Sequence, residues 1–220
     1  MDMILRGYMM NLPNKLSTLR ICLIPFFVFF YMADFVPYGK LIATIIFMGA
    51  CFTDFLDGHI ARSRGLITNL GKFLDSIADK ILVMAGIILI VAWPVKPYVG
   101  TVEAPIIFPT YVGIVAAIII LARELIISAF RQIAASKNVI LAADMYGKVK
   151  AVFQFITLIF YFVYAFIVET FYDANVAGWK TANAALGIAG YVLLAITVVM
   201  TIVSGIKYIT GNKKVLKEGN

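Results

Sequence analysis

Long charge-free apolar segments limit the possible folds of this chain more than any other feature. The three longest cover residues 104–122, 151–168 and 181–206. A helix that crosses a bilayer needs about 20 mostly apolar residues, and a helix satisfies its own backbone hydrogen bonds in lipid. Only 14% of the residues are charged, against about 25% in a typical soluble domain, and the mean hydropathy is +0.95. We therefore predict an all-α integral membrane protein.

Three shorter apolar runs, at 21–33, 41–53 and 81–95, bring the predicted transmembrane helices to six. Charged segments border these runs, so the helices must extend into them. We expect helices over residues 15–36, 40–63, 69–94, 105–134, 145–171 and 181–211. The first ten residues, apolar around Arg6, predict a short interfacial helix. No shift in composition marks a boundary, which predicts a single domain over residues 1–220.

The basic residues are distributed unevenly between the two sets of helix ends. Sixteen of the 19 fall in segments 6–20, 62–80, 123–150 and 207–217, and only Lys40, Lys96 and Lys180 fall at the opposite ends. The positive-inside rule then places both termini in the cytoplasm of a cell-membrane protein. The net charge of +7 suits anionic lipids or phosphorylated substrates, whereas so apolar a chain argues against nucleic acid. Two cysteines in apolar runs and one histidine predict neither disulfides nor a zinc site.

Four aspartates gather within residues 54–79, on the predicted cytoplasmic side. Asp54 and Asp57 are three residues apart, and Asp75 and Asp79 are four apart, so each pair shares one helix face. Four converging carboxylates would repel one another unless a cation neutralised them. Oxygen ligands favour a hard divalent ion, and four carboxylates can hold two ions. The pattern predicts a site for two Mg²⁺ or Mn²⁺ ions, although solvated helix ends would also explain the acids.

Small residues accompany the aspartates at matching helical positions. Gly58 and Ala61 lie within about 40° of Asp54 on a helical wheel, and Gly71 precedes Asp75 by one turn. They allow a bulky ligand to approach the backbone closely. Arg62 flanks the same face and can bind a phosphate. The combination indicates a diphosphate-binding site.

The spacing of these eight residues resembles the signature of the CDP-alcohol phosphatidyltransferases at every position. Members of that family are membrane homodimers that move a phosphatidyl or similar group from a CDP-linked donor to an alcohol and release CMP. The resemblance implies that the four aspartates hold two metal ions and that Asp79 is also the general base. It implies a donor site at the cytoplasmic edge, made by Gly58, Ala61, Gly71 and Arg62.

Segments outside the signature bear on the acceptor. Residues 11–18, 122–124 and 147–151 resemble the phosphatidylglycerophosphate synthase branch of that family, with Ser17 and Ala151 where threonine is usual. This resemblance implies CDP-diacylglycerol as donor and glycerol 3-phosphate, with about two negative charges, as an acceptor suited to clustered cations. We assign Asn14 and Thr18 to the donor site, with helix capping as the alternative. We assign the acceptor phosphate to Arg123, Arg131, Lys148 and Tyr208, with arginines that only anchor the topology as the alternative.

Other functions share parts of this pattern. A cardiolipin synthase or a phosphatidylinositol-phosphate synthase would carry the same aspartates with another acceptor. An intramembrane prenyltransferase also uses aspartates and Mg²⁺, but it normally has more spans and two separate aspartate motifs. A divalent-cation transporter would need acids along its path, whereas these cluster at one edge.

Overall fold

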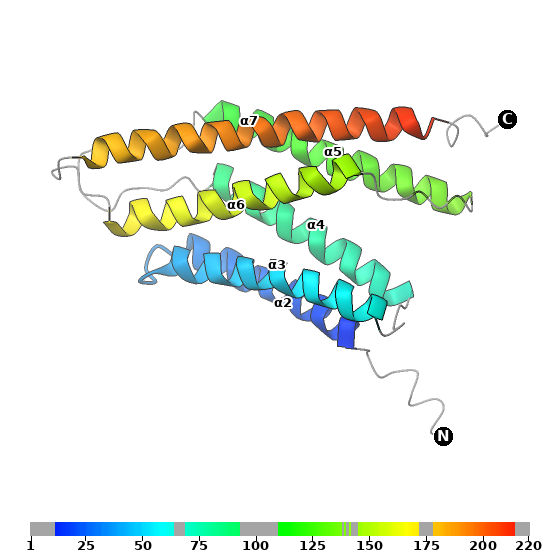
Figure 1. Cartoon of the computed structure of the whole chain (residues 1–220). Coiled ribbons are helices and arrows are strands. Elements are labelled where there is room, and N and C mark those ends of the chain that lie inside the picture. Colours follow the sequence, from blue (N-terminus) through cyan, green and yellow to red (C-terminus); the bar gives the residue numbers. More distant parts are fainter. Residues whose placement is uncertain are drawn as a thin grey trace, which may run out of the picture. The chain divides into compact units, whose positions relative to one another are not determined.

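The computed structural model is built from helices (Figure 1). It describes residues 12–63, 69–92, 110–137, 139, 141, 145–171 and 178–213. These residues form α2 (Leu12–Met32), α3 (Gly39–Ser63), α4 (Asn69–Ala92), α5 (Thr110–Ser136), α6 (Met145–Phe171) and α7 (Trp179–Gly211), and they include no β-strand. The all-α prediction is confirmed. The predicted interfacial helix at residues 1–10 lies outside the described residues.

Four of the described helices are long and apolar enough to cross a membrane. The candidate spans are Asn14–Met32, Tyr111–Ser136, Met145–Phe171 and Thr181–Gly211. In α3 the apolar part, Gly39–Thr53, is shorter, and both α3 and α4 carry the charged signature. Several such helices make this a membrane protein. The full count of six spans remains a prediction.

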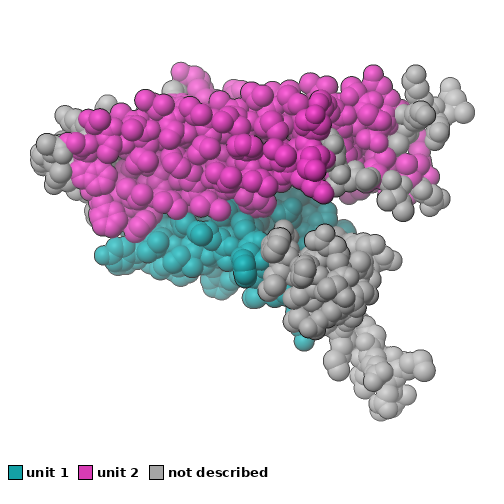
Figure 2. Space-filling model, in the orientation of Figure 1, with its two compact units in different colours: residues 1–89 teal, residues 90–220 magenta. Residues whose placement is uncertain are grey.

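The chain divides into two compact units, residues 1–89 and 90–220 (Figure 2). In unit 1, α2 and α3 pack together as a hairpin. Phe27 and Phe47 are fully buried there, with ring centroids 5.4 Å apart. Ala43 and Ala50, also fully buried, lie one helical turn before and after the position of Phe47 and keep this face of α3 small. The apolar faces of the two helices therefore meet each other.

The turn between α2 and α3 ends the first helix earlier than predicted. The prediction ran to residue 36, whereas α2 ends at Met32 and the chain turns through residues 33–38. A Cβ at Gly39 would lie only 2.6 Å from the main-chain oxygen of Phe30, so only glycine fits at this close approach. Asp34 in the turn pairs with Lys40 at 3.6 Å. Because Phe35 and Val36 are apolar, the hydropathy pattern does not show where the helix ends and the turn begins.

In unit 2, α7 packs against both α5 and α6. Near the C-terminal end of α5, Ile127, Phe130 and Ala134 form a buried cluster with Tyr208 of α7. Nearer the N-terminus of α7, a Cβ at Gly190 would lie 3.0 Å from the hydroxyl of Tyr161 in α6. Gly190 therefore permits a close approach of α6 and α7, as small residues do between membrane helices.

Candidate active site

The signature aspartates lie on two helices of unit 1. Asp54 and Asp57 fall in α3, together with Gly58, Ala61 and Arg62, and Asp75 and Asp79 fall in α4 with Gly71. The helical backbone that the spacing argument required is therefore present at both pairs. The side chains of residues 54–63 lie outside the described residues, so the predicted donor contacts of Gly58, Ala61 and Arg62 are not described.

Asp75 and Asp79 are the signature acids whose side chains the structure describes. They are one helical turn apart and both are partly exposed. Two carboxylates on one face offer only oxygen ligands, which fits the chemistry of Mg²⁺ or Mn²⁺. Among the described side chains there is no group of three or more His, Cys, Asp or Glu residues that could hold a metal ion. The predicted metal site adds Asp54 and Asp57 to these two acids.

Arg20 of α2 forms an ion pair with one of the predicted metal ligands. Its Nη1 lies 3.4 Å from Oδ1 of Asp75, and the arginine is fully buried while the Asp75 side chain is 49% exposed. A guanidinium cannot be buried without an anionic or polar partner, so the pair fixes one side of the Asp75 carboxylate. The only sequence signal for this contact is that Arg20 directly precedes an apolar run, which does not identify its partner.

Other polar side chains of α2 are buried near its N-terminus. Asn14 and Ser17 are buried, and the Thr18 hydroxyl donates to the main-chain oxygen of Asn14 at 2.9 Å. Asn14, Ser17 and Arg20 recur at three-residue intervals and form a buried polar stripe. Asn14 and Thr18 are among the predicted donor-site residues, whereas Ser17 stands in the sequence only as a departure from the family pattern.

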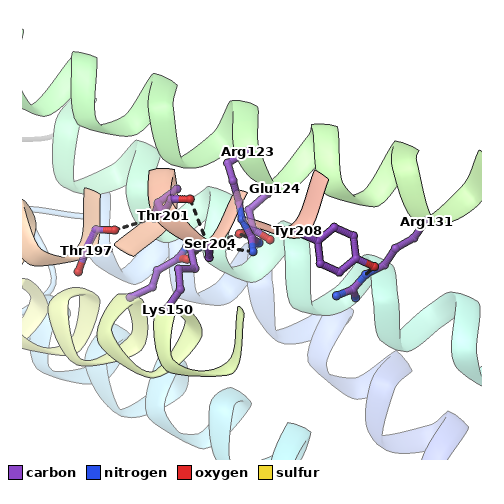
Figure 3. Close-up of polar contacts among 9 residues, drawn as sticks. Arg123, Glu124, Arg131, Lys150, Thr197, Thr201, Ser204 and Tyr208 are labelled. Atoms are coloured by element: carbon purple, nitrogen blue, oxygen red, sulfur yellow. Dashed lines mark hydrogen bonds and ion pairs between the residues drawn. The ribbon is translucent and has the colours of Figure 1, made fainter. Parts of the chain in front are cut away.

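A second polar group, here called the α5–α7 cluster, lies within unit 2 (Figure 3). Arg123 donates from Nη1 to Oε1 of Glu124 at 3.1 Å and from Nη2 to Oγ of Ser204 at 3.2 Å. The ammonium group of Lys150, on α6, donates to Glu124 Oε1 and to Gln154 Oε1. The cluster is therefore held together by one carboxylate that accepts hydrogen bonds from two cations.

Arg131 and Tyr208, both predicted as acceptor residues, contact each other at one side of this cluster (Figure 3). Arg131 Nε donates to the Tyr208 hydroxyl at 3.0 Å, and its guanidinium carbon lies 5.2 Å from the centre of the Tyr208 ring. Tyr208 is buried and Arg131 is exposed. The tyrosine thus positions the arginine while leaving its charge accessible.

Of the two lysines that begin α6, the structure places Lys150 in the cluster. Lys150 is 2% exposed and bonded to Glu124, whereas Lys148 is exposed. Residues two apart on a helix point about 200° apart, so the two lysines cannot share a face. The prediction named Lys148 as a cation close to the cytoplasmic face, and the family pattern contains both lysines. The prediction also left Glu124, Gln154 and Ser204 unassigned, although each is polar within or beside an apolar run.

Hydroxyl groups continue from the cluster along α7. Ser204 donates to the main-chain oxygen of Thr201 at 3.1 Å, and Thr201 to that of Thr197 at 2.6 Å. The Thr197 hydroxyl lies 2.7 Å from that of Thr157 on α6. All four residues are buried. In this hydroxyl row the Thr157–Thr197 contact joins α6 to α7, and Ser204 accepts a hydrogen bond from Arg123 of α5.

The signature on helical segments and the polar cluster on the last three helices agree with one enzyme class. The chain belongs to the CDP-alcohol phosphatidyltransferase family, whose model matches residues 10–209. It is therefore an enzyme of this kind, which excludes the prenyltransferase and transporter alternatives. The resemblance stated from the signature is confirmed.

Curated relatives share one activity in their names. The chain is 32% identical to the CDP-diacylglycerol–glycerol-3-phosphate 3-phosphatidyltransferase of Bacillus subtilis, over 96% of this chain and all of the relative. It is 33% identical to the enzyme of that name from Haemophilus influenzae, over 90% of this chain and 91% of the relative. The Rickettsia bellii enzyme of that name is 31% identical over 93% and 96%.

Proposed function

We propose that this protein transfers the phosphatidyl group of CDP-diacylglycerol to glycerol 3-phosphate, forming phosphatidylglycerophosphate and CMP. The observation that carries the proposal is the similarity, over nearly the whole chain, to several relatives with this activity in their names. The α5–α7 cluster supports a phosphorylated acceptor, because Arg123, Arg131 and Lys150 supply three cations against the single carboxylate of Glu124. An acceptor without charge would not need them.

The proposed acceptor site consists of the cations of the α5–α7 cluster, Arg131 and the side chains that orient them. Arg123, Arg131 and Lys150 bind the acceptor's phosphate, with buried Lys150 in place of the predicted and exposed Lys148. Glu124 holds Arg123 and Lys150 in position, and Tyr208 does the same for Arg131. Binding costs less when the cations are already oriented.

The proposed donor site rests on the signature. Asp54, Asp57, Asp75 and Asp79 hold two divalent ions, Mg²⁺ or Mn²⁺, which neutralise charge on the diphosphate and on the leaving CMP. Gly58, Ala61 and Gly71 line the cytidine site, and Arg62 contacts the donor's phosphates. Asn14 and Thr18 complete the site from α2, and Arg20 orients Asp75 through their ion pair.

The proposed reaction is a single displacement. Asp79 takes the proton of the acceptor's primary hydroxyl, and that oxygen attacks the phosphorus that carries the diacylglycerol. A new phosphorus–oxygen bond forms as the bond to CMP breaks, so CMP leaves with both bonding electrons. The charge that develops on the leaving group is balanced within the site, as general acid–base and metal-assisted catalysis require.

An acceptor panel tests this proposal. The purified protein in detergent is given CDP-diacylglycerol, Mg²⁺ or Mn²⁺, and one of glycerol 3-phosphate, phosphatidylglycerol, inositol phosphate or serine, and CMP release is measured. We expect release with glycerol 3-phosphate alone. Release with phosphatidylglycerol or inositol phosphate instead would identify a cardiolipin synthase or a phosphatidylinositol-phosphate synthase.

We also propose that the protein is a homodimer in the cell inner (plasma) membrane, with both termini and the active site on the cytoplasmic side. The bacterial relatives support the membrane location, and the bias of basic residues supports the topology. The homodimer rests on the family resemblance alone. Single cysteines introduced near Lys96 or Lys180 in a background lacking Cys22 and Cys51 should react with an impermeant reagent added outside cells. A cysteine near Lys214 should not react, and the reverse pattern would contradict the proposed topology.

A further inference from the structure

The side-chain amide of Gln154 is the least satisfied group of the α5–α7 cluster. Gln154 is 4% exposed and lies on α6, one turn after Lys150. Its Oε1 accepts a hydrogen bond from the Lys150 ammonium group. Its Nε2 is buried and has no hydrogen-bond partner in the described part of the chain.

The orientation of this amide follows from its neighbour. A lysine ammonium group has donors and no acceptor, so the amide end that faces Lys150 must be the oxygen. Exchanging the two ends of the amide would set donors against donors. The Nε2 group must therefore face away from Lys150, with two hydrogens to donate.

A second unsatisfied donor lies in the same cluster. Arg123 Nε is buried and has no hydrogen-bond partner among the described residues, although both Nη atoms are bonded. Buried donors without acceptors are rare in folded proteins. Two of them around one polar cluster indicate a ligand that brings acceptor oxygens. A metal ion is excluded as that ligand, because it would meet N–H groups.

The two donors differ in the oxygen they suit. Arg123 is charged, and with Lys150 and Arg131 it suits the oxygens of a phosphate. Gln154 is neutral and lies about 6 Å farther along α6 than Lys150, toward Thr157 of the hydroxyl row. A neutral donor next to the phosphate-binding cations suits a neutral oxygen of the same molecule.

We infer that Gln154 determines acceptor specificity by donating a hydrogen bond from Nε2 to the secondary hydroxyl of the acceptor. This inference rests on the proposed function, in which the acceptor is glycerol 3-phosphate. The secondary hydroxyl is the acceptor oxygen that neither reacts nor carries charge. A site built to hydrogen-bond a hydroxyl discriminates against the analogue that lacks it, because the buried donor is then left unpaired.

The test compares two acceptors in three proteins. Glycerol 3-phosphate and 1,3-propanediol monophosphate differ only in the secondary hydroxyl. The wild-type enzyme should need about five- to tenfold more of the deoxy analogue for half-maximal CMP release, the effect of one neutral hydrogen bond. Gln154→Met, similar in length but without a donor, should raise the half-saturating glycerol 3-phosphate by the same factor and leave that of the analogue unchanged.

Asn183→Leu is the matched control. Asn183 is another buried amide between α6 and α7, bonded to the Tyr164 hydroxyl at 2.6 Å. Its loss should lower the melting temperature and leave both half-saturating acceptor concentrations unchanged. The half-saturating CDP-diacylglycerol should be unchanged in all three proteins.

Gln154→Glu serves if the methionine variant does not fold, because the carboxylate keeps the shape and can pair with Lys150 but cannot donate. It should remove the discrimination between the two acceptors. An unchanged preference for glycerol 3-phosphate in either variant would overturn the inference, as would an equal loss with both acceptors. A wild-type enzyme that releases no CMP with glycerol 3-phosphate would instead refute the proposed function.

Discussion

Both units of the molecule pair a buried cation with a more exposed carboxylate, but the roles of the two groups differ. In unit 1, fully buried Arg20 holds Asp75, and about half of the Asp75 side chain stays exposed. In unit 2, buried Lys150 holds Glu124, which also accepts a hydrogen bond from Arg123. The carboxylate is the proposed ligand-binding group in unit 1 and the proposed support in unit 2. The same kind of ion pair thus has two proposed roles. In unit 1 the cation supports the carboxylate that binds the ligand, and in unit 2 the carboxylate supports the cations that bind it.

The largest expected effect tests whether the Asp79 carboxylate takes part in the reaction. Asp79→Asn keeps the size of the side chain but cannot accept the proton of the acceptor and binds metal weakly. CMP release should fall by about 100-fold or more. Asp34→Asn, in the α2–α3 turn, is the control and should retain activity. Near-normal turnover of Asp79→Asn at neutral pH would remove Asp79 from the reaction.

The next effect tests the cations of unit 2. Lys150→Met should raise the half-saturating glycerol 3-phosphate by about 10- to 150-fold, the effect of a charge-assisted contact worth about 1.5–3 kcal/mol. Lys148→Met is the matched control, with the same chemical change on the exposed face of α6. Its effect should stay below about twofold, and equal effects of the two variants would contradict the assignment of Lys150.

Because Lys150→Met leaves Glu124 with fewer partners, the double variant with Glu124→Gln separates binding from folding. Removing one member of a fully buried ion pair destabilises a protein by about 3–5 kcal/mol, and the cost here should be smaller because Glu124 is partly exposed. The double variant should regain part of the melting temperature while its need for glycerol 3-phosphate stays high. Recovery of both would mean that Lys150 acts only in folding.

A smaller effect tests the support of the metal ligand in unit 1. Arg20→Lys keeps the charge but loses the fork of donors that orients Asp75. Losses of groups that orient a metal ligand typically weaken metal binding by about 10- to 100-fold. We expect the lower end, measured as half-saturating Mn²⁺ and as Mn²⁺ binding by electron paramagnetic resonance. The half-saturating glycerol 3-phosphate should not change, and a change there alone would refute the positioning role.

The smallest expected effect separates the orientation of the Arg131 side chain from its charge. Tyr208→Phe removes the hydroxyl that accepts from Arg131 but leaves the ring beneath the guanidinium. The half-saturating glycerol 3-phosphate should rise by about two- to fivefold, as for one neutral hydrogen-bond partner. Arg131→Ala should cost more, because it also removes the charge. Equal costs would show that the charge of Arg131 plays no part.

The sequence predicted the helices well because their apolar runs and charged borders are long. The range of α6, residues 145–171, matches the prediction, and the end of α2 was overextended only because apolar residues continue into the turn. The signature was recognisable because its residues are contiguous and their spacing is fixed by helix geometry. Their roles in metal and donor binding remain predictions.

The α5–α7 cluster was harder to predict, because its members come from three helices that are separated in the sequence. Arg131 and Tyr208 were named separately, and only the fold brings them into contact. Lys148 and Lys150 lie two residues apart, and only packing reveals which one faces Glu124. Gln154 is one polar residue in a long apolar run, and its unpaired donor becomes evident only in three dimensions.

The hydroxyl row of α7 has a consequence for how the protein enters its membrane. Thr201 and Ser204 donate to carbonyl oxygens of their own helix, so these hydroxyls are satisfied before any neighbour arrives. These two side chains can enter the bilayer without exposing unpaired donors to lipid. Docking then adds bonds between helices, among them the bond between Thr157 and Thr197 and the contact of Ser204 with Arg123. Thr201 and Ser204, which would otherwise hinder insertion, thus reach the interior of the bundle already hydrogen-bonded.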